Sequence, residues 1–257
     1  MRNLPIVTRY LLIANGAVFV LAWILNPILI KHGVGYLPYG TTPIDHFCGL
    51  HYVGAGTFHF WQPFTYMFLH ANFWHLFFNM FAVWMFGPSI ERELGTRRYI
   101  IFYLLCGLGA AIVQEAVWAL MGYDPGVQPW LNTIGASGAV FGILFAFGWL
   151  FPNVPMFLLF IPIPIRARIF VLIYAGIELL SGIHSVTADS ADNVAHFAHL
   201  GGFLFGWLII LYWKHINWRE PQFGLFWEKC KGLFRRHKRL DSTKNSDFDN
   251  YHYQKRV

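Results

Sequence analysis

The chain has 257 residues, of which 56% are hydrophobic and only 12% are charged, and it carries a net charge of +6. A soluble domain carries about 25% charged residues, so this chain lacks the side chains that would cover a water-facing surface. The composition excludes a soluble enzyme, a disordered chain and a nucleic-acid-binding protein, and it predicts a polytopic membrane protein.

Several segments are long and apolar enough to cross a bilayer as helices, which requires roughly 20 mostly apolar residues. We count six of them and expect an all-α bundle of six membrane-spanning helices. In chain order, the expected spans cover about 10–30, 66–87, 99–121, 133–151, 169–184 and 195–213.

The distribution of Lys and Arg predicts the orientation of these spans. With the N-terminus in the cytoplasm, the inner segments hold 18 of the 19 Lys and Arg residues, and the outer loops hold only Lys31. The positive-inside rule requires such an asymmetry, and one span more or fewer would destroy it. We therefore expect both termini in the cytoplasm.

Two regions follow from this topology. Residues 1–213 form the membrane domain, with an aromatic-rich outer loop at 31–65 that we expect in the membrane interface. Residues 214–257 form a cytoplasmic tail with 11 of the 19 Lys and Arg residues. Within the tail, 223–240 mixes basic and apolar residues, which predicts an amphipathic helix on an anionic leaflet and a disordered end after Asp241. A solvated charged tail is the alternative.

Polar side chains are costly inside a bilayer and therefore mark candidate functional positions. His75 and Asn79 lie in the second expected span, Ser137 in the fourth and His199 in the sixth. These three spans all run from outside to inside. We expect Ser137 about four residues, or about 6 Å, below the start of its helix. Three helices then bring polar groups to a similar depth near the outer surface.

Small residues explain how two of these helices can approach each other. The pairs Gly138/Gly142 and Gly202/Gly206 are small-xxx-small motifs in the fourth and sixth spans, and such motifs allow close backbone contact. If the two stripes pack together, the serine hydroxyl and the histidine imidazole come within hydrogen-bond distance. A serine beside a neutral imidazole is the minimum apparatus for nucleophilic acyl transfer.

Further donors are expected beside the serine. His75 and Asn79 are four residues apart and share one helix face. Such donors can form an oxyanion hole, in which one donor is typically worth about 3 kcal/mol of barrier. The N-terminus of the helix that carries Ser137 would also favour developing negative charge.

The three motifs, in this order, resemble those of the rhomboid family of intramembrane serine proteases. They read His75-x-x-x-Asn79, Gly135-x-Ser137-Gly138 and Ala198-His199-x-x-Gly202-x-x-x-Gly206. The resemblance covers about residues 8–213 and extends to Trp61, Glu91 and Gly95. Gln62 departs from the pattern, because many members have Arg at this position.

The resemblance implies a bacterial-type, six-span enzyme that cleaves membrane-protein substrates in or next to their transmembrane segments. Ser137 would be the nucleophile and His199 the general base of a dyad without a third acid. His75, Asn79 and the backbone N–H of Ser137 would form the oxyanion hole, and Phe78 would lie near the substrate entrance. We expect no cofactor, a location in the cell (inner) membrane, and a site that opens to its outer, periplasmic side. The partners are transmembrane substrates and the lipid bilayer, and the oligomeric state is left open.

The same residues allow several alternative interpretations. His196, His199 and His70 could suggest a metal site, but there is no His-Glu-x-x-His motif, so we predict no metal. His199 is favoured over His196 as the base because glycines follow it at +3 and +7. A catalytically silent rhomboid-like binding or escort protein is the alternative function, and such relatives lack the serine or the histidine. A small transporter would instead place its site at the midplane.

Overall fold

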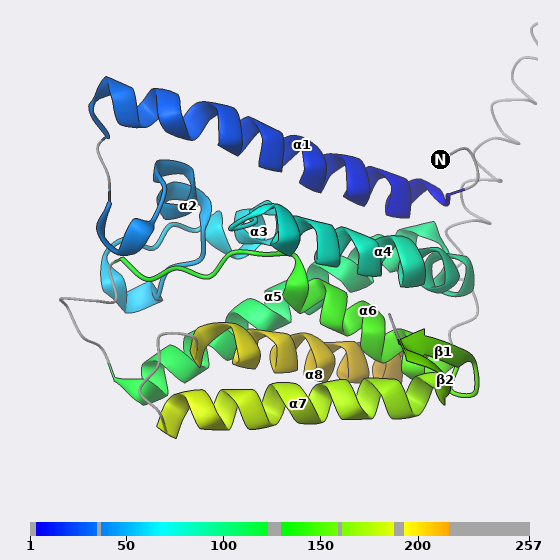
Figure 1. Ribbon diagram of the computed structural model, residues 1–257. Helices are drawn as coiled ribbons and strands as arrows, with labels where there is room; N and C mark the ends of the chain where they lie inside the picture. The colour runs from blue at the N-terminus through cyan, green and yellow to red at the C-terminus, as the bar shows by residue number, and fades with distance from the viewer. Residues whose placement is uncertain (1–3, 35–36, 123–129, 159–160, 188–192, 216–257) are drawn as a thin grey trace, which may run out of the picture. The chain divides into compact units, whose positions relative to one another are not determined.

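The computed structural model describes residues 4–34, 37–122, 130–158, 161–187 and 193–215, so nearly all of the predicted tail lies outside the described residues. The described chain is mostly helical (Figure 1). Its long helices are α1 (Ile6–Leu29), α4 (Phe73–Leu94), α5 (Thr96–Met121), α6 (Ser137–Leu150), α7 (Ala167–Thr187) and α8 (Asn193–His215). Short helices α2 (Pro43–Cys48) and α3 (Gln62–Thr65) lie in the connection between α1 and α4.

A small hairpin departs from the all-α expectation. Strands β1 (Pro155–Leu158) and β2 (Ile161–Arg166) pair antiparallel, with Pro155 opposite Arg166. The β2 sequence reads IPIPIR. Proline removes a helix hydrogen bond and is tolerated at sheet edges, so this segment pairs as a strand. Helix α7 begins at Ala167, two residues before the expected start of the fifth span.

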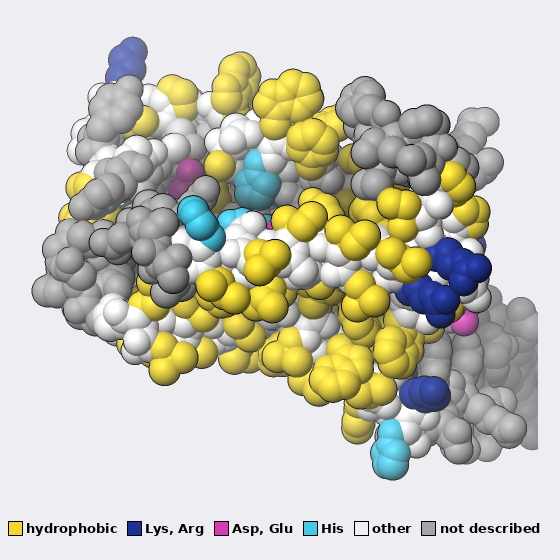
Figure 2. All heavy atoms as spheres, turned by 60° about the horizontal axis from the view of Figure 1, so that its bottom comes forward, with side chains coloured by type: hydrophobic (Ala, Val, Ile, Leu, Met, Phe, Trp, Pro, Cys, Tyr) yellow, Lys and Arg dark blue, Asp and Glu magenta, His cyan; other side chains and the backbone are white. Residues whose placement is uncertain are grey.

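Within the described residues, four helical stretches are long and apolar enough to cross a membrane. They are Ile6–Val34, Thr96–Met121, Ala167–His184 and His196–His215. Figure 2 shows hydrophobic side chains across the face that it draws, as expected of a surface in contact with lipid. Helix α6 has 14 residues, or about 21 Å, which is shorter than the roughly 30 Å hydrocarbon layer. The number of six spans stays a prediction.

The second expected span begins and ends later in the structure than at 66–87. Residues Tyr66–Phe68 form a tight 3₁₀ turn instead of the start of a long helix. Helix α4 begins at Phe73 because the Asn72 side chain accepts a hydrogen bond from the backbone N–H of His75 at 2.9 Å, which caps the first turn. The helix continues to Leu94 and ends before Gly95, whose φ is 79°.

The expected start of the fourth helix is also wrong. Ser137 is the first residue of α6 and does not lie four residues below its start. The preceding segment is extended because Thr133 pairs with Leu50, and the N–H of Gly135 donates to the carbonyl oxygen of Tyr66 at 2.9 Å. Gly135 adopts φ 135°, a conformation that glycine accepts without strain.

Basic residues gather at one end of the helical bundle. The start of α1, the turn between α4 and α5, and the β1–β2 hairpin all lie at the same end in Figure 1. This end carries the six arginines Arg9, Arg92, Arg97, Arg98, Arg166 and Arg168. The arrangement agrees with the expected clustering of positive charge on one side of the membrane.

A buried carboxylate joins α1 to α4 at this end. Glu91 is 2% exposed. Its Oε1 accepts from the N–H of Val7 at 2.9 Å, and its Oε2 accepts from the N–H and hydroxyl of Thr8 at 2.7 and 2.8 Å. Glu91 therefore satisfies N–H groups of the first turn of α1, where Pro5 offers no side-chain cap.

Gln62 organises the connection between α1 and α4. Its side chain is fully buried, and its oxygen accepts from the N–H groups of His51 and His59 at 3.3 and 3.1 Å. Its amide nitrogen donates to the carbonyl oxygens of Thr57 and Phe47 at 3.1 and 3.4 Å. The residue that departs from the family pattern thus holds the loop through its own neutral amide.

Candidate active site

The predicted packing of the two glycine stripes is confirmed. A Cβ added at Gly202 would overlap the carbonyl oxygen of Gly138, and one added at Gly206 would lie 3.2 Å from the Cα of Gly142. Helices α6 and α8 therefore touch through backbone atoms. This approach brings the start of α6 beside the first half of α8.

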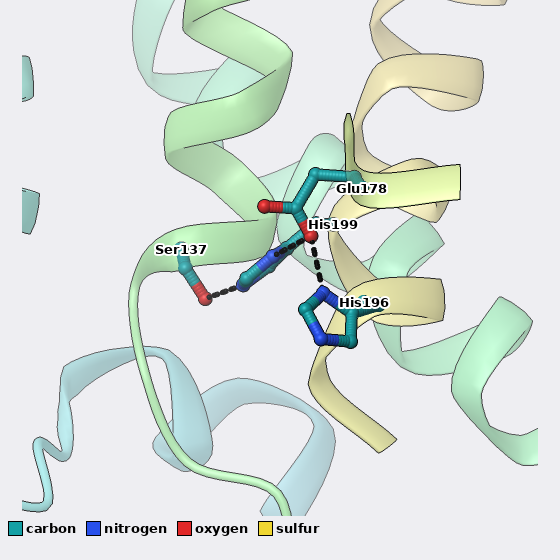
Figure 3. Close-up of polar contacts among 4 residues, drawn as sticks. All are labelled: Ser137, Glu178, His196 and His199. Carbon is teal, nitrogen blue, oxygen red and sulfur yellow. Dashed lines mark hydrogen bonds and ion pairs between the residues drawn. The ribbon is translucent and has the colours of Figure 1, made fainter. Parts of the chain in front are cut away.

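Ser137 and His199 meet at this contact (Figure 3). The Oγ of Ser137 lies 2.8 Å from the Nε2 of His199, and both residues are half-buried. The ring of His199 stacks on Phe141, with centroids 4.2 Å apart and an interplanar angle of 10°. Phe141 is one turn after Ser137 on α6, so a single helix supplies the hydroxyl and the surface that fixes the plane of the imidazole.

A third side chain, Glu178 of α7, joins this pair. Its Oε2 lies 2.9 Å from the Nδ1 of His199 and 2.7 Å from the Nδ1 of His196, and Figure 3 shows the two imidazoles converging on one carboxylate oxygen. The resemblance implied a dyad without a third acid. A carboxylate within a predicted apolar span was the available signal.

His75 reaches the same region from α4. A Cβ added at Gly135 would lie 2.8 Å from the His75 ring and 3.5 Å from the Oγ of Ser137, so both side chains lie against this glycine. The backbone N–H of Ala71 points to the Nδ1 of His75 at 3.4 Å. An Nδ1 that accepts leaves Nε2 to carry the proton, which makes the His75 Nε2–H a donor beside the serine.

Asn79 and Phe78 lie on α4 beyond His75. The side-chain amide of Asn79 is buried and donates to the carbonyl oxygen of His75 at 2.8 Å, so one of its two amide hydrogens is used within its own helix. Phe78 is 56% exposed and stacks on Trp74. Its ring therefore belongs to the outer surface of α4, and its role at a substrate entrance stays a prediction.

The same cluster contains the residues that could hold a metal ion. The ligand atoms of Glu178, His196 and His199 all lie within 4.8 Å of one another. The N···O separations of 2.7 and 2.9 Å are those of direct hydrogen bonds. Ligands on one tetrahedral zinc ion, at about 2.1 Å each, would lie about 3.3 Å apart. The observed separations fit hydrogen bonds between the Glu178 carboxylate and the two imidazoles.

Comparisons with known proteins agree on one family. A family model of the Rhomboid domain matches residues 57–215. The chain is 31% identical over 148 residues to "Rhomboid protein 1, mitochondrial" of Saccharomyces cerevisiae, a match covering 55% of this chain and 40% of that protein. It is 28% identical over 146 residues to "Rhomboid protease GluP" of Bacillus subtilis, covering 57% of this chain and 24% of that protein.

A third relative is the "Presenilin-associated rhomboid-like protein, mitochondrial" of Mus musculus, 29% identical over 163 residues, which are 60% of this chain and 39% of that protein. The matches to these three relatives thus span at most 40% of their length. The family model nevertheless covers more than half of this chain, including the α6–α8 contact and the residues that meet there. The chain is an integral membrane protein of the rhomboid family.

Proposed function

We propose that this protein is an intramembrane serine endopeptidase that cleaves peptide bonds in or next to transmembrane segments of membrane-protein substrates. The observation that carries the proposal is the 2.8 Å contact between the Oγ of Ser137 and the Nε2 of His199. The relative from Bacillus subtilis that is named a rhomboid protease supports the same class of reaction.

In the acylation step, the Oγ of Ser137 attacks the carbonyl carbon of the scissile peptide while its proton passes to the Nε2 of His199. The carbonyl oxygen becomes an oxyanion. In this proposal the Nε2–H of His75 and the backbone N–H of Ser137 donate to the oxyanion. Ser137 is the first residue of α6, and N–H groups of the first turn of a helix have no acceptor within that helix. The remaining amide hydrogen of Asn79 supplies a further donor on the same helix as His75.

The rest of the cycle restores Ser137 and His199 to their starting protonation states. The imidazolium of His199 gives the Nε2 proton to the leaving amine as the C–N bond breaks, which leaves an acyl group on Ser137. A water molecule then attacks the carbonyl carbon of this ester while His199 takes one of its protons. The bond between the acyl carbon and Oγ breaks, the new carboxyl end of the substrate leaves, and His199 returns the proton to the Oγ of Ser137. No cofactor is needed for this sequence.

The substrate must change conformation before it can react. A transmembrane helix hides its peptide carbonyl groups in internal hydrogen bonds, so the scissile segment has to unwind before it reaches Ser137. Helix-breaking or small residues near the outer end of the substrate span should therefore favour cleavage. The basic residues lie at the end of the bundle to which α6 runs, and Ser137 lies at the beginning of α6, away from that end; this supports a site that opens outward. The location in the cell inner membrane stays a prediction.

The test is cleavage of a reporter that carries a single membrane span between two soluble domains, with the protease reconstituted in liposomes. We expect Ser137→Ala and His199→Ala to lower the rate at least about 1000-fold. Ser89→Ala and His32→Ala are matched controls, because Ser89 lies on α4 and His32 follows α1, and neither residue belongs to the proposed site. Both variants should retain the rate of the unmodified protein.

Labelling with a serine-directed fluorophosphonate separates the protease from the escort alternative. A protease should be labelled at Ser137, and the label should disappear in both Ser137→Ala and His199→Ala. An unmodified protein that binds single-span clients but neither cleaves the reporter nor reacts with the fluorophosphonate would overturn the proposed function.

A further inference from the structure

Glu178 contacts the imidazole that the reaction uses, but the steps above give it no part. We infer that Glu178 is a positioning residue for His199, which turns the expected Ser137–His199 pair into a hydrogen-bonded group of three residues on α6, α8 and α7. This inference rests on the proposed protease function and deepens it.

The first argument comes from proton positions. An ionised carboxylate has acceptors only, so a ring nitrogen at 2.9 Å from the Oε2 of Glu178 must donate. We therefore assign the proton of neutral His199 to Nδ1. Its Nε2 then has a free lone pair, which is the tautomer that can accept the proton of Ser137. In the opposite tautomer, Nε2 would carry a proton and could not act as the base.

The second argument concerns charge during the reaction. When His199 takes the proton of Ser137, it becomes an imidazolium whose Nδ1–H already points at a carboxylate. The carboxylate takes no proton in this step, but it stabilises the positive charge through a charge-assisted hydrogen bond. Glu178 is only 9% exposed, so water weakens this interaction little.

The third argument is the cost of the arrangement. A carboxylate in an apolar helix such as α7 is unfavourable unless it is paired. Here the pairing is specific: Oε2 receives both the His199 and the His196 ring nitrogens. Gly182, one turn further along α7, leaves room for α8, because an added Cβ would lie 3.4 Å from the Cβ of His196.

His196 gives the carboxylate a fixed direction. Its ring stands nearly perpendicular to that of His199, at 89° and with centroids 6.3 Å apart, so it holds Oε2 from a second side. His196 contacts Glu178 and not the serine in this arrangement (Figure 3). It therefore supports Glu178, while His199 alone faces Ser137.

The inference is tested with Glu178→Gln, which keeps the shape of the side chain but removes its charge. Two measurements are made on the reconstituted protein: the rate of fluorophosphonate labelling, which depends on the activation of Ser137, and kcat and KM for the single-span reporter. The end-point of labelling counts the folded sites. We expect the labelling rate and kcat to fall about 10- to 100-fold, with the end-point unchanged and KM within about two-fold of the unmodified value.

Two further variants sharpen the result. Glu115→Gln is the matched control, because Glu115 is a partly buried carboxylate of α5 that accepts a hydrogen bond from the backbone N–H of Val53, and its labelling rate should not change. Glu178→Asp keeps the charge but shortens the side chain by one methylene. It should recover part of the rate lost in Glu178→Gln.

Several outcomes would overturn the inference while leaving the proposed function intact. One is a Glu178→Gln protein that labels and cleaves at the unmodified rate. Another is a raised KM with unchanged kcat, which would assign Glu178 to substrate binding. Loss of labelling of the unmodified protein by EDTA would assign the cluster to a metal. If Glu178→Gln does not fold, a folded Glu178→Asp with an unchanged labelling rate would contradict the inference. In contrast, an unmodified protein that neither reacts with the fluorophosphonate nor cleaves the reporter would overturn the proposed function itself.

Discussion

Replacing Glu91 should weaken the attachment of α1 to the bundle more than any other single change at the basic end. Its carboxylate accepts three hydrogen bonds from two residues of the first turn of α1. The variant Glu91→Gln has nearly the same shape but offers one oxygen and one NH₂ group. The NH₂ group would face a backbone N–H, so two donors would meet and at least one hydrogen bond would be lost.

The size of the effect follows from this geometry. A buried N–H left without a partner costs about 1–3 kcal/mol. Losing the negative charge at a helix N-terminus costs about 0.3–1 kcal/mol at exposed sites and up to ~2 kcal/mol where the charge is partly buried. Together these contributions predict a loss of about 2–4 kcal/mol in the free energy of unfolding. For a chain of this size, the thermal midpoint should fall by about 5–15 °C.

The assay is thermal unfolding of the purified protein in one detergent, with Glu93→Gln as the matched control. Glu93 is on the same helix two residues later but is exposed, so its replacement should shift the midpoint by less than about 2 °C. A second comparison uses Thr8→Val, which removes only the hydroxyl donor. The double variant with Glu91→Gln should lose less than the sum of the single variants, because both act on one hydrogen-bonded group.

Equal midpoints for Glu91→Gln and Glu93→Gln would refute the reasoning, since they would mean that the first turn of α1 does not depend on the carboxylate. Strict additivity with Thr8→Val would contradict the shared hydrogen bond in the same way.

Three further predictions concern the packing and the outer connection. Gly202→Ala should separate α6 from α8, because its methyl group meets the carbonyl oxygen of Gly138, and reporter cleavage should fall at least about 10-fold. Gln62→Leu leaves two N–H groups without their partner and should lower the free energy of unfolding by about 2–4 kcal/mol, measured by denaturant titration. Burial lowers the pKa of His51 to about 4, while its unfolded value is about 6.5. The contribution of neutral His51 to the free energy of unfolding should therefore be fully present above about pH 6.5 and should decline as the pH falls toward 4. Thermal unfolding of His51→Gln should show a flatter pH dependence.

The sequence was most informative where the type of a residue alone determines how closely helices can pack or how costly its burial is. The glycine pairs predicted a backbone contact between two helices, and the structure has it between Gly138 and Gly202. The serine and the histidine were singled out because polar groups are costly among apolar residues, and the structure brings them within 2.8 Å. In both cases the signal was local and needed no knowledge of the neighbouring elements.

The remainder depends on contacts between segments far apart in the chain. The start of α6 at Ser137 is set by hydrogen bonds of the preceding segment with Leu50 and Tyr66. The pattern of apolar residues does not indicate these hydrogen bonds. The position of Glu178 on α7 was visible, but its partners depend on how α7 rotates against α8. The β1–β2 hairpin lies between the fourth and fifth expected spans, and the alternating proline and isoleucine residues of β2 do not by themselves indicate the strand with which it pairs.

The short length of α6 affects what surrounds Ser137. Because the helix begins only at Ser137, the peptide groups just before it have no helical partners and would be poorly tolerated among acyl chains. Leu50 and Tyr66 satisfy several of them, so the folded connection that carries these two residues acts as a seal over the segment that leads to Ser137. Loosening that seal would expose a polar strand to hydrocarbon. Substitutions on the outer surface of the connection should therefore be tolerated better than substitutions that displace the backbone of Leu50 or Tyr66.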